Sequence, residues 1–132
     1  MASVLKLRVV TPERQLVEAE AEAVQLPGAE GYLGILPGHA PLITLLKTGV
    51  LSYRRGGREE AWAIASGLAE ISDDRVSVLA DSAEGPEDID AAAAERERAE
   101  AEREMGTAGA DTLPEVTARF ELAAARLAVV RR

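Results

Sequence analysis

Hydrophobic and polar residues alternate along the first two thirds of the chain. Near its start, Leu5, Leu7 and Val9 are separated by Lys6 and Arg8. The same alternation returns in the segments 18–23, 62–64 and 76–80. A period of two is typical of a β-strand that buries one face and exposes the other, so this region is predicted to form several short strands.

Turn-forming pairs of residues lie between these segments. Pro27-Gly28 and Pro37-Gly38 each suit a type II turn, because proline fixes its own φ and glycine accepts a positive φ. Gly56-Gly57 predicts a two-residue hairpin turn. Short strands at this spacing are typical of an antiparallel sandwich or flattened barrel, which we expect over residues 1–85.

From Pro86 onward the pattern becomes helical. Pro86, Glu87 and Asp88 are suited to the start of a helix that is rich in strong helix formers. Residues 106–114 interrupt it with two glycines before a second helical segment, whose apolar stripe is Val116, Phe120, Ala123, Leu127 and Val130. The sequence therefore predicts an α+β protein, in which a β-sandwich precedes an antiparallel two-helix hairpin over residues 86–132.

The two helical segments carry opposite charge. Residues 86–105 hold eight acids and three arginines, a net charge of −5, whereas residues 115–132 hold four arginines and two acids, a net charge of +2. The first segment offers mainly alanine methyl groups, whose burial contributes less than the roughly 1.5–3 kcal/mol of a large apolar side chain. We expect a hairpin that closes on itself and is weakly held, as a switch requires. The alternative is a plain solvated hairpin that does not switch.

The composition narrows the possible functions. The chain has 132 residues, a net charge of −8 and no cysteine. The negative charge disfavours binding to nucleic acid or to an anionic membrane surface, and the lack of cysteine removes disulfides and thiolate chemistry. The sequence shows neither a secretory signal nor an apolar run of membrane-spanning length. We expect a soluble cytosolic protein that reaches a membrane only through a partner.

The segment "LPGAEGYLGILPGHAPLIT", residues 26–44, looks at first like an active-site loop. It matches neither the P-loop nor the dinucleotide-binding fingerprint. His39 with Glu30 could supply a general base, but no convincing nucleophile accompanies them, and one histidine without cysteine is a poor metal site. A docking surface remains, for which we expect Glu30, Tyr32 and His39 to be exposed and Ile35 and Leu36 to belong to the core.

The same segment resembles a known family. The residues that carry the resemblance are Glu30-Gly31, Leu33-Gly34, Pro37-Gly38-His39-Ala40-Pro41, Lys47 and Gly49. They are similar to the signature of the ε subunit of F-type ATP synthases, which is called δ in mitochondria. The runs "VVTPER" and "GLAEISDDRVSVLAD" and the two-helix tail follow in the family's order, so the resemblance covers essentially the whole chain.

The resemblance implies a non-catalytic subunit of the rotor, or central stalk. Its flattened ten-stranded β-sandwich would grip the γ subunit and sit on the membrane ring of c subunits, at the cytoplasmic face of the bacterial plasma membrane. The subunit would then help to couple proton flow to ATP synthesis. Glu30, Gly31, Tyr32 and His39 would lie at or near the polar loops of the c-ring or the γ subunit. Tyr32 departs from the family, where an acid is frequent, so an ionic contact would be lost there.

The resemblance also implies that the helical hairpin is a brake. Folded down, it packs against the sandwich; extended, it reaches the α/β catalytic head, where basic residues meet an acidic loop of the β subunit and ATP hydrolysis is inhibited. The four basic residues that suit this role are Arg119, Arg126, Arg131 and Arg132.

Some relatives bind ATP in the folded hairpin through an Ile/Leu-Asp-x-x-Arg-Ala motif. This chain has Ala93 in place of the motif arginine, which leaves Glu84, Asp90 and Arg98 as candidate ligands. Without that guanidinium the phosphates lose a bidentate partner, so we expect weak or no ATP binding, no other cofactor and no metal. A stand-alone nucleotide-sensing module is the alternative, and Ala93 counts against it. An enzyme centred on His39 and Glu30 is opposed by the missing nucleophile.

Overall fold

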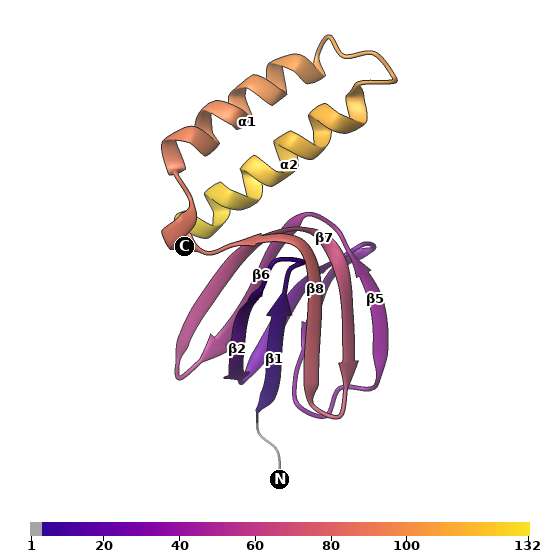
Figure 1. Ribbon diagram of the computed structural model, residues 1–132, viewed down its shortest axis with the longest axis vertical. Helices are drawn as coiled ribbons and strands as arrows, with labels where there is room; N and C mark the ends of the chain where they lie inside the picture. The colour runs from indigo at the N-terminus through magenta and orange to yellow at the C-terminus, as the bar shows by residue number, and fades with distance from the viewer. Residues whose placement is uncertain (1–3) are drawn as a thin grey trace.

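The computed structural model describes residues 4–132, which form a β-sandwich with a helical hairpin on one end (Figure 1). The elements in chain order are β1 Leu5–Val10, β2 Gln15–Ala21, β3 Ala23–Gly28, β4 Gly31–Ile35, β5 Leu42–Leu46, β6 Gly49–Arg55, β7 Arg58–Ser72, β8 Arg75–Glu84, η1 Pro86–Asp88, α1 Ala91–Met105 and α2 Leu113–Val130. The predicted α+β class is therefore confirmed.

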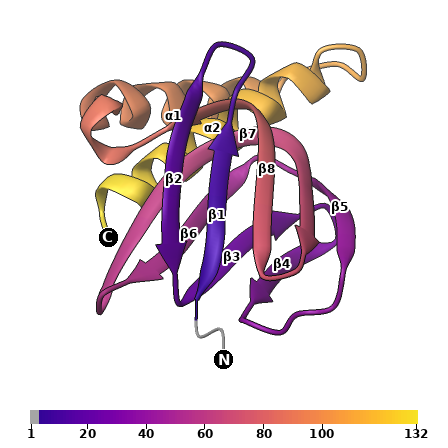
Figure 2. The same ribbon diagram turned by 60° about the horizontal axis from the view of Figure 1, so that its bottom comes forward.

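The strands form two layers that share one long strand. One layer has the order β2-β1-β8-β7-β5, and Figure 2 shows β2, β1 and β8 side by side. In the other layer β3 pairs with β4 and β6, and β6 pairs with the first half of β7. The 15-residue β7 bends at Ser66 and Gly67, where φ is 38° and 158°. We find eight strands rather than the ten that the family resemblance implies, because β7 and β8 each run continuously through a bend.

One strand pair departs from the antiparallel prediction. β1 and β8 run parallel, with Lys6 opposite Arg75 and Val10 opposite Leu79. Antiparallel order follows from short hairpin turns, whereas these two strands are separated by most of the domain and no hairpin fixes their relative direction.

The predicted turns are correct at two of the three sites. Gly56 and Gly57, with φ of 58° and 78°, close a two-residue hairpin between β6 and β7. At Pro37-Gly38 the φ of Gly38 is 89°, and the His39 N–H donates to the Leu36 carbonyl at 3.1 Å, as in a type II turn. The turn predicted at Pro27-Gly28 is wrong. Gly28 lies within β3, where a β-carbon would stand 2.6 Å from the Gly31 carbonyl oxygen, so it serves close packing.

The core between the layers is built from the alternating apolar positions. Its largest fully buried side chains in the sandwich are Leu5, Leu7, Leu26, Ile35, Leu51, Ile64 and Ile71. Trp62 packs against the same cluster as Ile64, as their spacing in the sequence predicts. Ala61 and Ala63 lie on the opposite face of β7, where they meet the helical hairpin.

The hairpin stands on the outer face of β6 and β7, with α2 between α1 and the sheet (Figure 1). Ala125 and Val129 of α2 pack on an area of the sheet formed by Val50, Ala61 and Ala63, which we call the α2 docking surface. Of the predicted apolar stripe, Val116, Ala123 and Leu127 are buried on another side of the helix, whereas Phe120 and Val130 are only half-buried.

The first helix begins later than the sequence predicts. Pro86–Asp88 form only a 3₁₀ turn, and α1 starts at Ala91. The Asp90 side chain accepts a hydrogen bond from the Ala93 N–H at 3.1 Å, so Asp90 is the N-cap. Thr112 occupies the N-cap position of α2, but its side chain makes no capping hydrogen bond.

Candidate functional site

The residues predicted to contact the rotor are not gathered at one place. Glu30 lies in the turn before β4, and His39 lies in the loop after it, so the length of β4 separates them. Glu30 is exposed and the Tyr32 side chain is 50% exposed, whereas His39 is half-buried. His39 Nδ1 lies 2.6 Å from the Ala40 carbonyl oxygen, which holds the ring against its own loop.

We call the end of the sandwich that carries Ala29, Glu30 and Gly31 the β3–β4 tip. The Ala29 N–H donates to the Leu45 carbonyl and the Lys47 N–H donates to the Pro27 carbonyl, both at 2.9 Å, so the tip is bonded to the end of β5. These backbone bonds hold the exposed Glu30 on a fixed support, as a docking surface requires.

The opposite end of β4 leads into a second braced loop. The Gly38 N–H donates to Asp74 Oδ1 at 2.7 Å, which ties this loop to the turn between β7 and β8. Leu36, predicted to be core, is 62% exposed at the start of this loop. The prediction failed because consecutive side chains of an extended segment point to opposite faces, so that Ile35 is buried and Leu36 is not.

The sequence analysis missed an exposed apolar surface on the layer that contains β5, β7 and β8. Leu45 is paired with Leu68, and Leu68 with Leu79, so these three side chains stand in line across three strands. Leu45 is 64% exposed and Leu79 is 60% exposed. We call this line the leucine row; Ile43, also exposed, precedes it on β5. The sequence signal that could have revealed this surface is that large apolar residues stand next to one another on these strands, as at Leu45-Leu46 and Val78-Leu79, so that one of each pair must face outward.

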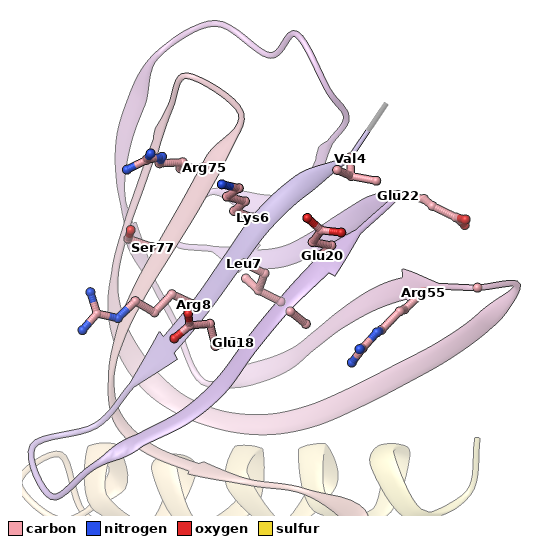
Figure 3. Close-up of a pocket in the computed structure, with 12 residues that line it drawn as sticks. Val4, Lys6, Leu7, Arg8, Glu18, Glu20, Glu22, Arg55, Arg75 and Ser77 are labelled. Carbon is pink, nitrogen blue, oxygen red and sulfur yellow. The ribbon is translucent and has the colours of Figure 1, made fainter. Parts of the chain in front are cut away.

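The same face becomes charged further along β1, β2 and β8. A hollow of about 810 Å³ there is lined by Lys6, Arg8, Glu18, Glu20 and Arg75 (Figure 3). Lys6 stands opposite Glu20 and Arg8 opposite Glu18, so the charges compensate across the strands. The acids of β2 also protect this edge strand against pairing with another chain. No catalytic arrangement is formed in this hollow.

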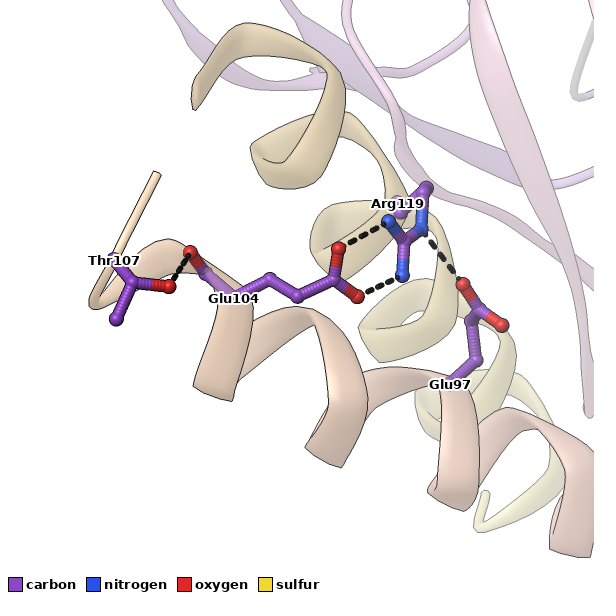
Figure 4. Close-up of polar contacts among 4 residues, drawn as sticks. All are labelled: Glu97, Glu104, Thr107 and Arg119. Carbon is purple, nitrogen blue, oxygen red and sulfur yellow. Dashed lines mark hydrogen bonds and ion pairs between the residues drawn. The ribbon is translucent and has the colours of Figure 1, made fainter. Parts of the chain in front are cut away.

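Arg119, the first of the four predicted regulatory arginines, joins the two helices (Figure 4). Its guanidinium donates to both carboxylate oxygens of Glu104, at 2.7 and 3.1 Å, and to Glu97 at 2.9 Å. The hydrogen bond from Arg119 holds the pKa of Glu104 below its usual value, and the two carboxylates raise the pKa of Arg119. This contact closes the hairpin on itself, as the opposite charges predicted.

The other three arginines that were predicted to be regulatory are also paired with acids. Arg126 donates to Glu84 at 2.7 Å, in a pair that is about 70% buried, and so links α2 to the end of β8. Arg132 pairs with Glu59 of β7, and Arg131 pairs with Glu95 of α1. All four side chains are therefore held by this chain's own carboxylates when the hairpin is docked.

The three candidate nucleotide ligands have partners within the chain. The Glu84 carboxylate accepts from Arg126, the Asp90 carboxylate caps α1, and Arg98 lies 3.6 Å from Glu95. Across residues 4–132 there is no group of three or more side chains fit to hold a metal ion. In the same range no helix is long and apolar enough to cross a membrane.

Comparisons with known proteins agree on one family. Residues 4–86 match the family model described as "ATP synthase, Delta/Epsilon chain, beta-sandwich domain". The ATP synthase epsilon chain of Koribacter versatilis is 47% identical over 83% of this chain and 77% of its own length, and that of Moorella thermoacetica is 50% identical over 80% and 78%. A chain in the cryo-EM structure of Euglena gracilis mitochondrial ATP synthase superposes with a TM-score of 0.85 over all of this chain and 84% of its own, at 20% identity, and so shares its fold. This chain therefore belongs to the delta/epsilon family of ATP synthase and is a non-catalytic subunit of that complex.

Proposed function

We propose that this chain works in the central stalk of a proton-translocating ATP synthase and attaches to the γ subunit through its leucine row. In this position it helps to couple proton flow to ATP synthesis. The observation that carries the proposal is the line of Leu45, Leu68 and Leu79 on the surface of the sandwich. Contiguous exposed apolar side chains mark protein contacts, and buried apolar area is the main source of affinity in the centre of an interface.

Calorimetric titration of the chain into the γ subunit from the same source tests this proposal. Leu79→Asp places a charge at one end of the row, at a 60% exposed position, and should weaken binding about tenfold or more. Leu113→Asp is the control, because Leu113 is also exposed but lies at the start of α2, away from the sandwich, and it should leave the affinity unchanged. Equal affinity of the Leu79→Asp variant and the wild type would remove the leucine row from the interface.

The β3–β4 tip is the part of the sandwich that we place against the ring of c subunits. Glu30 and Tyr32 are exposed there, and the backbone bonds to β5 keep the tip in a fixed shape. His39 lies at the other end of β4, so we assign it to the side of the γ subunit. This arrangement makes the chain peripheral to the membrane, on the cytoplasmic face of the bacterial plasma membrane.

The hairpin is the part that we propose as a brake on ATP hydrolysis. In the docked state each of the four arginines is held by a carboxylate of this chain, so extension must exchange these partners for acidic residues of the β subunit. Substituting Arg131 and Arg132 by alanine should relieve inhibition of hydrolysis in the assembled complex, because the charge that reaches the head is reduced. Unchanged inhibition would exclude these two side chains from the contact.

We propose further that ATP does not control the hairpin of this chain. Ala93 supplies no guanidinium, and Glu84, Asp90 and Arg98 are engaged with other groups. Calorimetry should therefore detect no binding of ATP at micromolar concentrations. A micromolar affinity would contradict this proposal and favour the alternative of a nucleotide-sensing module.

A further inference from the structure

Strand β3 changes partner near the β3–β4 tip. Its start, Ala23–Gln25, pairs with β6, whereas its last residue, Gly28, pairs with Leu46 of β5. The chain turns from β5 into β6 opposite this change of partner. A backbone N–H at the start of β6 therefore faces β3 without a carbonyl in register, and a buried N–H needs an acceptor.

The Tyr32 hydroxyl supplies that acceptor. The Val50 N–H donates to Tyr32 Oη at 3.0 Å. Gly49 provides the space for this contact, because a β-carbon there would stand 2.9 Å from Tyr32 Oη and 2.8 Å from Pro27 Cβ. The tyrosine thus reaches from β4 across β3 to β6, although half of its side chain is exposed.

Val50 has a second set of contacts. Its side chain belongs to the α2 docking surface and packs in one cluster with Ala125 and Val129 of α2. Val50 therefore donates its backbone N–H to the Tyr32 hydroxyl and supports the helical hairpin with its side chain. The path from the tip to the hairpin is one hydrogen bond followed by one packing contact.

We propose that Tyr32 is a positioning residue that couples the β3–β4 tip to the docking of α2. Holding the Val50 N–H fixes the start of β6 and with it the position of the Val50 side chain under α2. A partner that moves Tyr32 at the tip then changes how firmly the hairpin is docked. Because coupling between two sites is reciprocal, release of α2 must also loosen the Tyr32 contact. In this role Tyr32 acts within the chain, whereas the acid that is frequent at this position in the family would act through an ionic contact to a partner.

Amide hydrogen exchange of the whole chain tests this coupling without any partner. A negative result would therefore contradict the coupling but leave the proposed binding to the γ subunit untouched. Tyr32→Phe removes only the hydroxyl. It should accelerate exchange of the Val50 amide and of α2 amides around Ala125 roughly five- to tenfold, as expected for the loss of one hydrogen bond. Ser77→Ala is the control, since it removes an exposed hydroxyl from β8, outside both the β3–β4 tip and the α2 docking surface, and it should leave both regions unchanged.

The reverse experiment uses Ala125→Asp, which places a carboxylate in the α2 docking surface. It should release α2 and, by reciprocity, accelerate exchange of the Val50 amide and shift the ring resonances of Tyr32. Two results would overturn the proposal: faster Val50 exchange in Tyr32→Phe with α2 unaffected, or an unchanged Tyr32 signal when α2 is released.

Discussion

The sandwich and the helical hairpin are held together by different side chains. The sandwich core contains leucine, isoleucine and valine from both layers, many of them completely buried. The surface on which α2 docks is made mainly of alanine and valine, supplemented by the ion pairs Arg126–Glu84 and Arg132–Glu59. Large apolar side chains contribute roughly 1.5–3 kcal/mol each on burial, and partly exposed ion pairs contribute about 0–1 kcal/mol. One chain therefore combines a permanent scaffold with an appendage that is docked by smaller contributions.

The largest effect should come from the sandwich core. Ile64→Ala deletes a fully buried side chain between the layers and should lower the free energy of unfolding by about 2–5 kcal/mol in a urea titration. Ile43→Ala, at a 65% exposed position, should change it by less than about 0.5 kcal/mol. Similar losses for the two variants would contradict the division between core and surface.

Alkaline pH should weaken the sandwich rather than the hairpin. Burial, assisted by Glu60, raises the pKa of Tyr53 from 10.0 to about 12. The unfolded chain therefore loses this proton first, and stability falls as the pH rises from about 10 to about 12, by an amount on the order of 1–3 kcal/mol. Urea titrations across this range should show a shallower decline for Tyr53→Phe, and identical slopes would remove Tyr53 as the cause.

A smaller and local effect should follow from opening the ion pairs between the helices. Arg119→Met keeps the long apolar stem but loses the bonds to Glu97 and Glu104, so α1 and α2 amides should exchange faster while β1 and β8 amides do not change. High salt should act in the same direction, because these partly exposed pairs are screened. Arg96→Met, on the exposed side of α1, is the control. A change throughout the sandwich would show that the two regions are not independent.

The smallest effect should be the response of the hairpin to acid. Because the hydrogen bond from Arg119 lowers the pKa of Glu104, the contribution of this carboxylate is present above the ordinary glutamate pKa and is lost as the pH falls through the lower folded value. Protection of the α1 amides against exchange, measured relative to an unfolded chain at the same pH, should therefore fall slightly on acidification from pH 5 to pH 3. Glu104→Gln should show less pH dependence, and the exposed Glu100→Gln should behave like the wild type.

Local patterns in the sequence predicted much of the fold. Alternation at Leu5, Leu7 and Val9 correctly predicted a strand, and Gly56-Gly57 correctly predicted the hairpin turn between β6 and β7. Predictions that needed the path of the chain in space were less successful. Gly28 was assigned to a turn and Leu36 to the core, because the extent of β3 depends on its pairing with β5, and the face of β4 that is buried depends on how the two layers pack.

The candidate contact residues show the same limit. Glu30, Tyr32 and His39 come from one continuous segment, which favoured a single contact site, yet the length of β4 separates the first from the last. The leucine row was missed because Leu45, Leu68 and Leu79 are far apart in sequence and meet only through strand pairing.

The sequence by itself determined the two-part organisation, the charge of each helix and the family, because periodicity, net charge and a contiguous motif are properties of neighbouring residues. Only the tertiary structure decided that each regulatory arginine is already paired, that Tyr32 bonds to Val50, and that three leucines form one surface. These contacts join residues that the chain brings together across layers, and their partners depend on strand order, register and the position of α2, which no local pattern records.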